Sequence, residues 1–147
     1  MPSASSFRPS GSVWAHQGRL WLVCAALSAA SAAAVTGDLY VVCNPNVSLH
    51  LNEVRDVFIG EKSFAGAVRL TPADNAAAQS AFLDKVLKVS ADKYASLWTK
   101  KAFRDGANPP HVIFNDAEAI AYTRQTPGAC SYLQSLPPGG VTVVGKF

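Results

Sequence analysis

The stretch TPGACSYL (126–133) decides how the last part of the chain folds. Its Pro127-Gly128 pair is typical of a tight turn, and the mostly apolar residues after it predict a short buried strand. The centre of that strand is Cys130. The pattern alone leaves three interpretations of this side chain open: a packed core residue, one half of a disulfide or a reactive thiol.

The first residues predict the cellular compartment of the protein, and with it the chemical environment of Cys130. Arg8 and Arg19 precede LWLVCAALSAASAAA (20–34), an apolar run that thins into small residues. A basic start, an apolar centre of roughly 7–15 residues and an A-x-A end are typical of a secretory signal peptide. We therefore expect residues 1–34 to be a signal peptide and residues 35–147 to be periplasmic or secreted. The apolar centre is far shorter than the ~20 residues of a spanning helix, so we do not expect it to act as a membrane anchor. No membrane span is expected after cleavage.

Composition predicts one domain in residues 35–147 and gives no sign of a nucleic-acid partner. This length is enough to bury a core and typical of a single domain. Two of the thirteen Lys and Arg residues precede position 35, which leaves eleven against ten Asp and Glu. Such a balance lacks the basic excess of a nucleic-acid-binding protein. Cys43 and Cys130 remain after cleavage, an even number for an oxidising compartment.

The order of the predicted elements indicates an α/β fold. Strand patterns and helix patterns alternate along the chain, which is typical of helices layered on a mainly parallel or mixed sheet. Pro72 is expected to end the second strand, because proline cannot donate to a strand ladder. Strands are expected in 38–44, 66–71, 111–115, 129–133 and 141–145, and helices in 51–60, 76–89, 91–106 and 117–121. The expected helix caps are Asn52, Asp74 or Asn75, Ser90, and Asn115 or Asp116.

Patterns that suggest catalysis have simpler structural explanations. Ser90-x-x-Lys93 matches a nucleophile motif, but its partner motifs S-D-N and K-T-G are absent from the sequence and Ser90 fits a helix cap. His50 and His111 have no second ligand at metal spacing, so neither a metal nor another cofactor is expected. A thiol enzyme that uses Cys130 with His111 is the alternative hypothesis. We expect no enzyme, because a cysteine inside an apolar strand is usually buried and inert.

Three sequence landmarks occur in a fixed order along residues 35–147: LNEVRDVFIG (51–60), a segment around Trp98, and TPGACSYL (126–133). Together they resemble one lobe of the phosphate-type substrate-binding proteins of ABC importers. That family has a strand ending in Asn before a helix of the pattern L-x-x-I-F-x-G, and later a T-x-G-A-I-G-Y-V strand. The matching positions are Leu51, Val54, Val57, Phe58, Ile59, Gly60, Leu97, Trp98, Phe103, Gly106, Thr126, Gly128, Ala129, Tyr132 and Leu133.

The resemblance implies a fold and a class of function. The fold is a single three-layer lobe of the type II periplasmic-binding-protein kind, with a mixed sheet and helices on both faces. The function is non-catalytic binding related to phosphate ABC transport. The chain departs from the family in length, because complete members have two lobes joined by a hinge. It also has alanines where members hold phosphate with Ser-Gly-Thr. The ligand-binding candidates that follow are Arg69, Asp74, Asn75, Ala76, Ala77 and Ala78.

Two binding roles stay open. In the first, the helix start at residues 76–78 binds phosphate or another small anion weakly, and a homodimer supplies the missing lobe. In the second, the lobe has lost its ligand and is a structural partner of an envelope protein such as a transporter, porin or sensor. The missing Ser-Gly-Thr favours the second role, and a cap by Asp74 or Asn75 would occupy the place of the anion.

The resemblance also bears on the two cysteines. In the family the strand that corresponds to residues 129–133 runs through the centre of the lobe, beside the strand that corresponds to residues 38–44. This arrangement brings Cys43 and Cys130 within the Cα separation of about 4.4–6.8 Å that a disulfide needs. We therefore expect a disulfide, with two separately buried thiols as the alternative.

Overall fold

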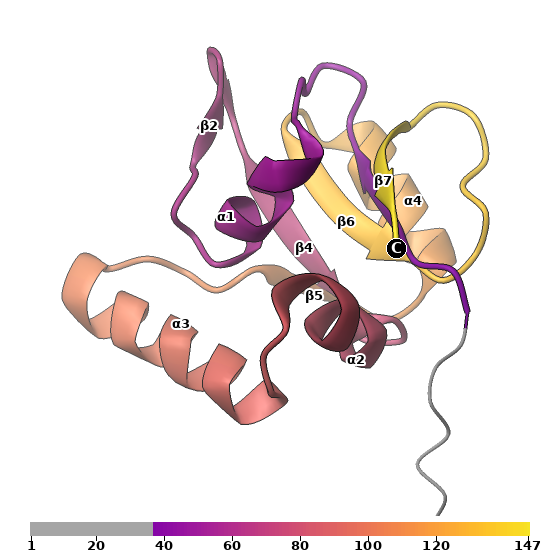
Figure 1. Cartoon of the computed structure of the whole chain (residues 1–147). Helices are drawn as coiled ribbons and strands as arrows, with labels where there is room; N and C mark the ends of the chain where they lie inside the picture. The colour runs from indigo at the N-terminus through magenta and orange to yellow at the C-terminus, as the bar shows by residue number, and fades with distance from the viewer. Residues whose placement is uncertain (1–36) are drawn as a thin grey trace, which may run out of the picture. The chain divides into compact units, whose positions relative to one another are not determined.

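A computed structural model describes residues 37–147, in which strands and helices alternate as expected (Figure 1). The predicted signal peptide, residues 1–34, lies outside the described residues. None of the helices in the described part is long and apolar enough to cross a membrane. The strands are β1 (Tyr40–Cys43), β2 (Phe64–Ala65), β3 (Val68–Arg69), β4 (Thr71–Asn75), β5 (His111–Ile113), β6 (Ala129–Leu133) and β7 (Thr142–Lys146). The helical elements are the 3-10 helix η1 (Leu51–Glu53), α1 (Val54–Phe58), α2 (Gln79–Phe82), the π-helical turn η2 (Leu83–Leu87), α3 (Ala91–Asp105) and α4 (Asp116–Gln125).

Five strands form one mixed sheet in the order β5-β4-β6-β1-β7. β4 pairs in parallel with both β5 and β6. β1 pairs antiparallel with β6 on one side and with β7 on the other. β2 and β3 form a separate two-stranded hairpin. The predicted α/β class with a mixed sheet is therefore confirmed.

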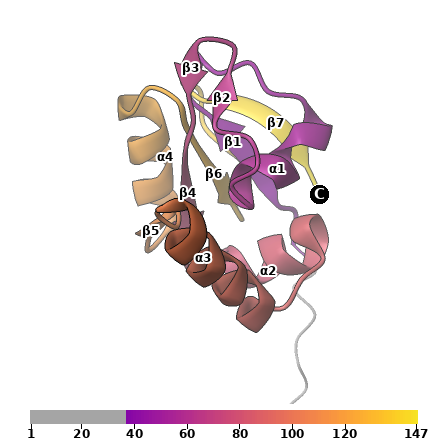
Figure 2. The same cartoon turned by 90° about the vertical axis from the view of Figure 1, so that its left-hand side faces the viewer.

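Helices cover both faces of this sheet, and each face has its own hydrophobic cluster. Val41, Cys130 and Tyr132 point to the face that carries α1, α2 and α3. Val42 and Leu133 point to the opposite face, where α4 packs. Figure 2 shows α4 on one side of the strands and α1 on the other. The alternation of side chains along β1 and β6 thus produces the three layers.

Three aromatic rings in mutual contact join the helices to the larger cluster. The ring of Phe82 in α2 lies parallel to that of Tyr132 in β6, with centroids 4.0 Å apart. The ring of Phe58 in α1 meets Phe82 edge-on at 4.7 Å. All three side chains are fully buried. Such contacts add to the area that the rings remove from water.

The expectation that Pro72 ends a strand is wrong, because Pro72 lies inside β4. Thr71 donates its N–H to Gly128 O at 2.9 Å, so the backbone polar groups of Thr71 point towards β6. Those of the next residue point towards the β5 side. β5 begins opposite Ala73, one residue later. The nitrogen of Pro72 therefore lies where no neighbouring strand offers a hydrogen-bond acceptor, so the lack of an N–H costs no ladder bond.

Three details of the predicted helices are also wrong. The helix expected from residue 76 begins at Gln79, because Ala76 donates its N–H to Ile113 O at 2.7 Å and continues the sheet edge. Asn52 is not a cap, because η1 already begins at Leu51. The helical spacing within residues 91–106 also predicts Ala102 on the buried face of α3, but Ala102 is exposed.

Candidate functional site

Cys43 and Cys130 form a disulfide between neighbouring strands. They are direct partners in the β1–β6 register, with Cα atoms 4.0 Å apart. The flanking bond from Asn44 N to Ala129 O, 2.8 Å, puts the cysteines at a non-hydrogen-bonded position, where paired Cα atoms approach most closely. The pairing expected from the resemblance is confirmed. Cys130 is fully buried and has no free thiol in this form of the protein.

The N–H groups of the three candidate alanines are already used inside the protein. Ala76 N donates to Ile113 O, as described above. Ala77 N donates to Asn75 Oδ1 at 3.2 Å, and Ala78 N donates to Asn75 O at 3.0 Å. An anion at this turn would have to displace these acceptors. The helix that follows starts without a side-chain cap, so neither Asp74 nor Asn75 caps it.

Arg69 does not lie near the other candidates. It is in β3, where it pairs with Phe64, and it precedes β4. Asp74 and Asn75 are at the far end of β4. A strand rises about 3.3 Å per residue, so roughly 15 Å separates Arg69 from Asp74. The structure therefore divides the predicted set between two opposite edges of the sheet.

Asp116 lies at the edge where the parallel strands end, and the sequence interpretation gave it no role beyond an alternative helix cap. Asp116 Oδ2 accepts hydrogen bonds from Gln134 N at 3.0 Å, Ser135 N at 2.8 Å and Ser135 Oγ at 2.6 Å. Its Oδ1 accepts from Asn75 Nδ2 at 2.7 Å. The carboxyl ends of parallel strands are the usual ligand site of open α/β sheets. Here the chain's own carboxylate occupies the donors that an anion would use.

Asp74 is the buried polar centre of the larger cluster, with only 4% of its surface exposed. Tyr94 Oη and Tyr132 Oη each donate to Asp74 Oδ1 at 3.1 Å, and Gln79 Nε2 donates to Oδ2 at 3.4 Å. Burial raises the pKa of the Asp74 carboxyl above its usual range, against the opposing effect of these donors. Burial, and then the charge of Asp74, raise the pKa of both tyrosines, so their hydroxyls stay protonated donors. Asp74 thus joins β4, β6, α2 and α3.

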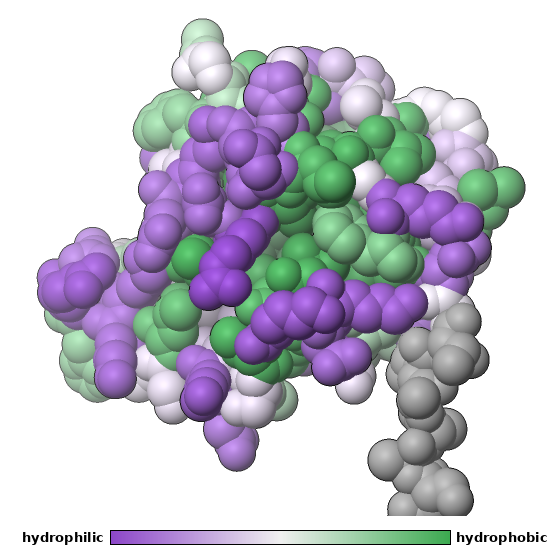
Figure 3. Space-filling view, viewed as in Figure 1, coloured by the Kyte–Doolittle hydropathy of each residue, from purple (hydrophilic) through white to green (hydrophobic). Residues whose placement is uncertain are grey.

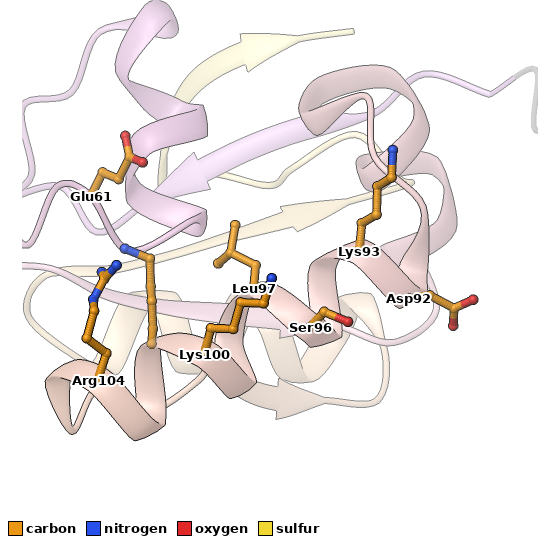
Figure 4. A pocket seen from close by; sticks show the side chains of 8 residues that line it. Glu61, Asp92, Lys93, Ser96, Leu97, Lys100 and Arg104 are labelled. Atoms are coloured by element: carbon orange, nitrogen blue, oxygen red, sulfur yellow. The ribbon is translucent and has the colours of Figure 1, made fainter.

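The described surface has a hollow of about 600 Å³ along α3. Figure 4 shows Lys93, Lys100 and Arg104 on α3, with Glu61 across from them. Side chains of both charges line this hollow, and Leu97 is its apolar residue. Such a mixture is typical of the solvated face of a helix. Within residues 37–147 no three His, Cys, Asp or Glu residues gather to hold a metal ion.

A second pocket, of about 390 Å³, lies at the edge of the sheet where β4 and β5 begin. Arg69 and His111 line it, together with Trp98 of α3. The indole of Trp98 is buried, with 7% of the residue exposed. The pocket therefore combines the donors of Arg69 and His111 with an aromatic wall. Sequence reasoning singled out Arg69 for anion binding but associated it with the wrong edge of the sheet.

A third pocket, of about 470 Å³, is mostly apolar and lies between α3 and β5. Phe103 and Val112 line it and are largely exposed.

Searches against models of known protein families and against curated proteins found no match to this chain. The likeness to phosphate-type substrate-binding proteins therefore rests on the sequence landmarks alone.

Proposed function

We propose that this chain is an exported, non-catalytic α/β lobe related to the phosphate-type substrate-binding proteins. In this proposal its role is that of a structural partner for an envelope protein, and it is not a phosphate receptor. The order of the sequence landmarks and the mixed sheet with helices on both faces support the relationship. The disulfide between Cys43 and Cys130 is compatible with an extracytoplasmic location, since such bonds persist in oxidising compartments.

The saturated edge of the sheet is the observation that carries this proposal. Phosphate binding needs several free donors that converge on one point. At this edge the donors of Asn75, Gln134 and Ser135 converge on Asp116 instead. The carboxylate would also repel a phosphate electrostatically. The lobe is therefore better suited to a role without phosphate.

A hydrophobic surface supports the partner role. Leu51 of η1 is 52% exposed, and its side chain and the ring of Phe147 both lie close to Gly145 of β7. Figure 3 shows hydrophobic residues at the surface in the region of α1 and β7, with hydrophilic residues around them. Exposed apolar patches edged by polar residues are typical of interaction sites.

Calorimetric titration with phosphate, sulfate and acetate tests the absence of an anion site at this edge. The titration uses the Arg69→Gln protein, because this substitution removes the guanidinium at the other edge of the sheet. We expect none of the three anions to bind to it at millimolar concentrations. Asp116→Ala in the same background should create phosphate binding, because it frees the donors of Asn75, Gln134 and Ser135.

The control is Asp84→Ala, which removes an exposed carboxylate that takes no part in the hydrogen bonds of this network. It should leave the titration unchanged. Phosphate binding by the Arg69→Gln protein with Asp116 intact would contradict the proposal, and so would an Asp116→Ala protein that folds but binds no anion.

A further inference from the structure

The pocket at the start of β4 and β5 is lined by donors and by no carboxylate. Hydrogen-bond donors come from the segment before β2, from β3 and from the first residues of β4 and β5. None of the Asp or Glu residues within 37–147 lines it, in contrast to the hollow along α3, where Glu61 and Asp92 do. The donors are Lys62, Ser63, Arg69, Thr71 and His111. A site of this composition favours a negatively charged group.

Arg69 is the main positive charge of this pocket. It is exposed, and it makes no ion pair or side-chain hydrogen bond within residues 37–147. Lys62 contributes less, because its Nζ lies 2.7 Å from Glu53 Oε1 and the two charges offset each other. A guanidinium binds carboxylate or phosphate oxygens through two parallel hydrogen bonds. Arg69 can therefore hold an anionic head group in a defined orientation.

The walls of the pocket call for an apolar body behind that head group. Trp98 lines the pocket with only 7% of its surface exposed. Pro110 is buried beside it, and the rings of His111 and Tyr122 lie 5.6 Å apart at the rim. Inorganic phosphate alone would leave the exposed ring of His111 and the partly exposed ring of Tyr122 uncovered. A flat apolar group would remove their area from water.

We propose that this pocket binds a small organic anion, a carboxylate or phosphate monoester joined to a flat apolar group. Arg69 holds the anionic head, and Trp98, Pro110 and Tyr122 cover the apolar body. This site is distinct from the turn at residues 76–78, because it lies at the opposite edge of the sheet. It is also independent of the partner role proposed above.

Nuclear magnetic resonance of the 15N-labelled protein tests this site directly. The reporter is the indole N–H signal of Trp98, which is identified by its loss in Trp98→Phe. Benzoate and phenyl phosphate should shift this signal in a saturable way, whereas uncharged benzyl alcohol and inorganic phosphate should bind at least tenfold more weakly. Comparison of benzoate with phenyl phosphate separates the two head groups.

Variants assign the binding to Arg69. Arg69→Gln should weaken benzoate and phenyl phosphate binding at least tenfold, and His111→Gln is a second variant if Arg69→Gln lowers the melting temperature. Lys100→Gln is the matched control, because it removes a cation that lines only the hollow along α3. No shift with either probe at about 10 mM would overturn the proposal. Equal binding by Arg69→Gln, or equal binding of benzyl alcohol, would also overturn it.

Discussion

At the scale of single residues, Asp74 shows how a buried charge can be structural. Its carboxyl receives hydrogen bonds from Tyr94, Tyr132 and Gln79, and no Lys or Arg pairs with it in the described part of the chain. A buried carboxylate without a cationic partner is costly when it is ionised. The three donors reduce this cost without removing it. The carboxyl therefore links four elements of the core at a cost in stability when it is ionised.

We predict that Asp74→Asn changes how stability depends on pH. Because burial raises the pKa of Asp74, the folded state binds the proton more tightly than the unfolded chain does. The contribution of this group to the free energy of unfolding is therefore largest in acid, and it falls as pH rises from the unfolded pKa to the folded one. Asparagine does not ionise and so does not lose stability in this way. The free energy of unfolding of Asp74→Asn should therefore rise relative to that of the parent protein as the pH rises from about 4 to about 7.

Urea denaturation at both pH values measures this gain. Asp84→Asn, at an exposed position, serves as the control and should show a constant difference from the parent protein. A difference for Asp74→Asn that shrinks towards neutral pH would show that the folded state prefers the ionised carboxyl.

At the scale of the elements, the turn before β6 depends on a close contact that only glycine permits. Gly128 has φ of 78°, and a Cβ atom at this position would overlap Arg69 O. Its N–H donates to Asn46 Oδ1 at 3.3 Å, and its O accepts from Thr71 N. The turn thereby sets the parallel register of β4 and β6.

We predict that Gly128→Ala destabilises the protein by about 2–4 kcal/mol, because it adds a steric overlap to the strain of a positive φ. Gly66→Ala is the matched control. Gly66 has φ of 60°, but a Cβ there would meet nothing within 4 Å, so only about 1 kcal/mol of backbone strain is expected. Chemical denaturation of the two variants measures both values. Equal losses would mean that the overlap with Arg69 O relaxes without cost.

At the scale of the whole described domain, the disulfide joins two central strands that are 87 positions apart in sequence. β1 comes first in the described chain and β6 close to its end, yet both point Cys43 and Cys130 into the same cluster. A bond across such a separation restricts the unfolded chain strongly.

We predict that the double variant Cys43→Ala, Cys130→Ala lowers the free energy of unfolding by about 3–4 kcal/mol. Urea denaturation measures the loss, and the parent protein with reductant should match the double variant without it. Peptides that contain the two cysteines should stay linked in mass spectra until they are reduced. A parent protein whose stability does not change with reductant would contradict the bond's contribution.

The sequence by itself determined the elements whose signals are local. The apolar runs around Val42 and Tyr132 became β1 and β6, and Ser90 and Asn115 cap α3 and α4 as predicted, with bonds to Lys93 N and Glu118 N. These features depend on neighbouring residues, whose pattern the sequence displays directly. The prediction that Cys43 pairs with Cys130 also depended on the family resemblance, because the two residues are far apart in sequence.

Only the tertiary structure decided which residues form each site. Pro72 fits inside β4 because β5 begins one residue later, and Ala76 belongs to the sheet edge because Ile113 O accepts its N–H. Arg69 and Asp74 are close in sequence, yet an extended strand carries them to opposite edges. Asp116 meets Asn75 across 41 positions of sequence. Such contacts depend on how strands pair, and pairing is a property of the whole sheet that no local pattern contains.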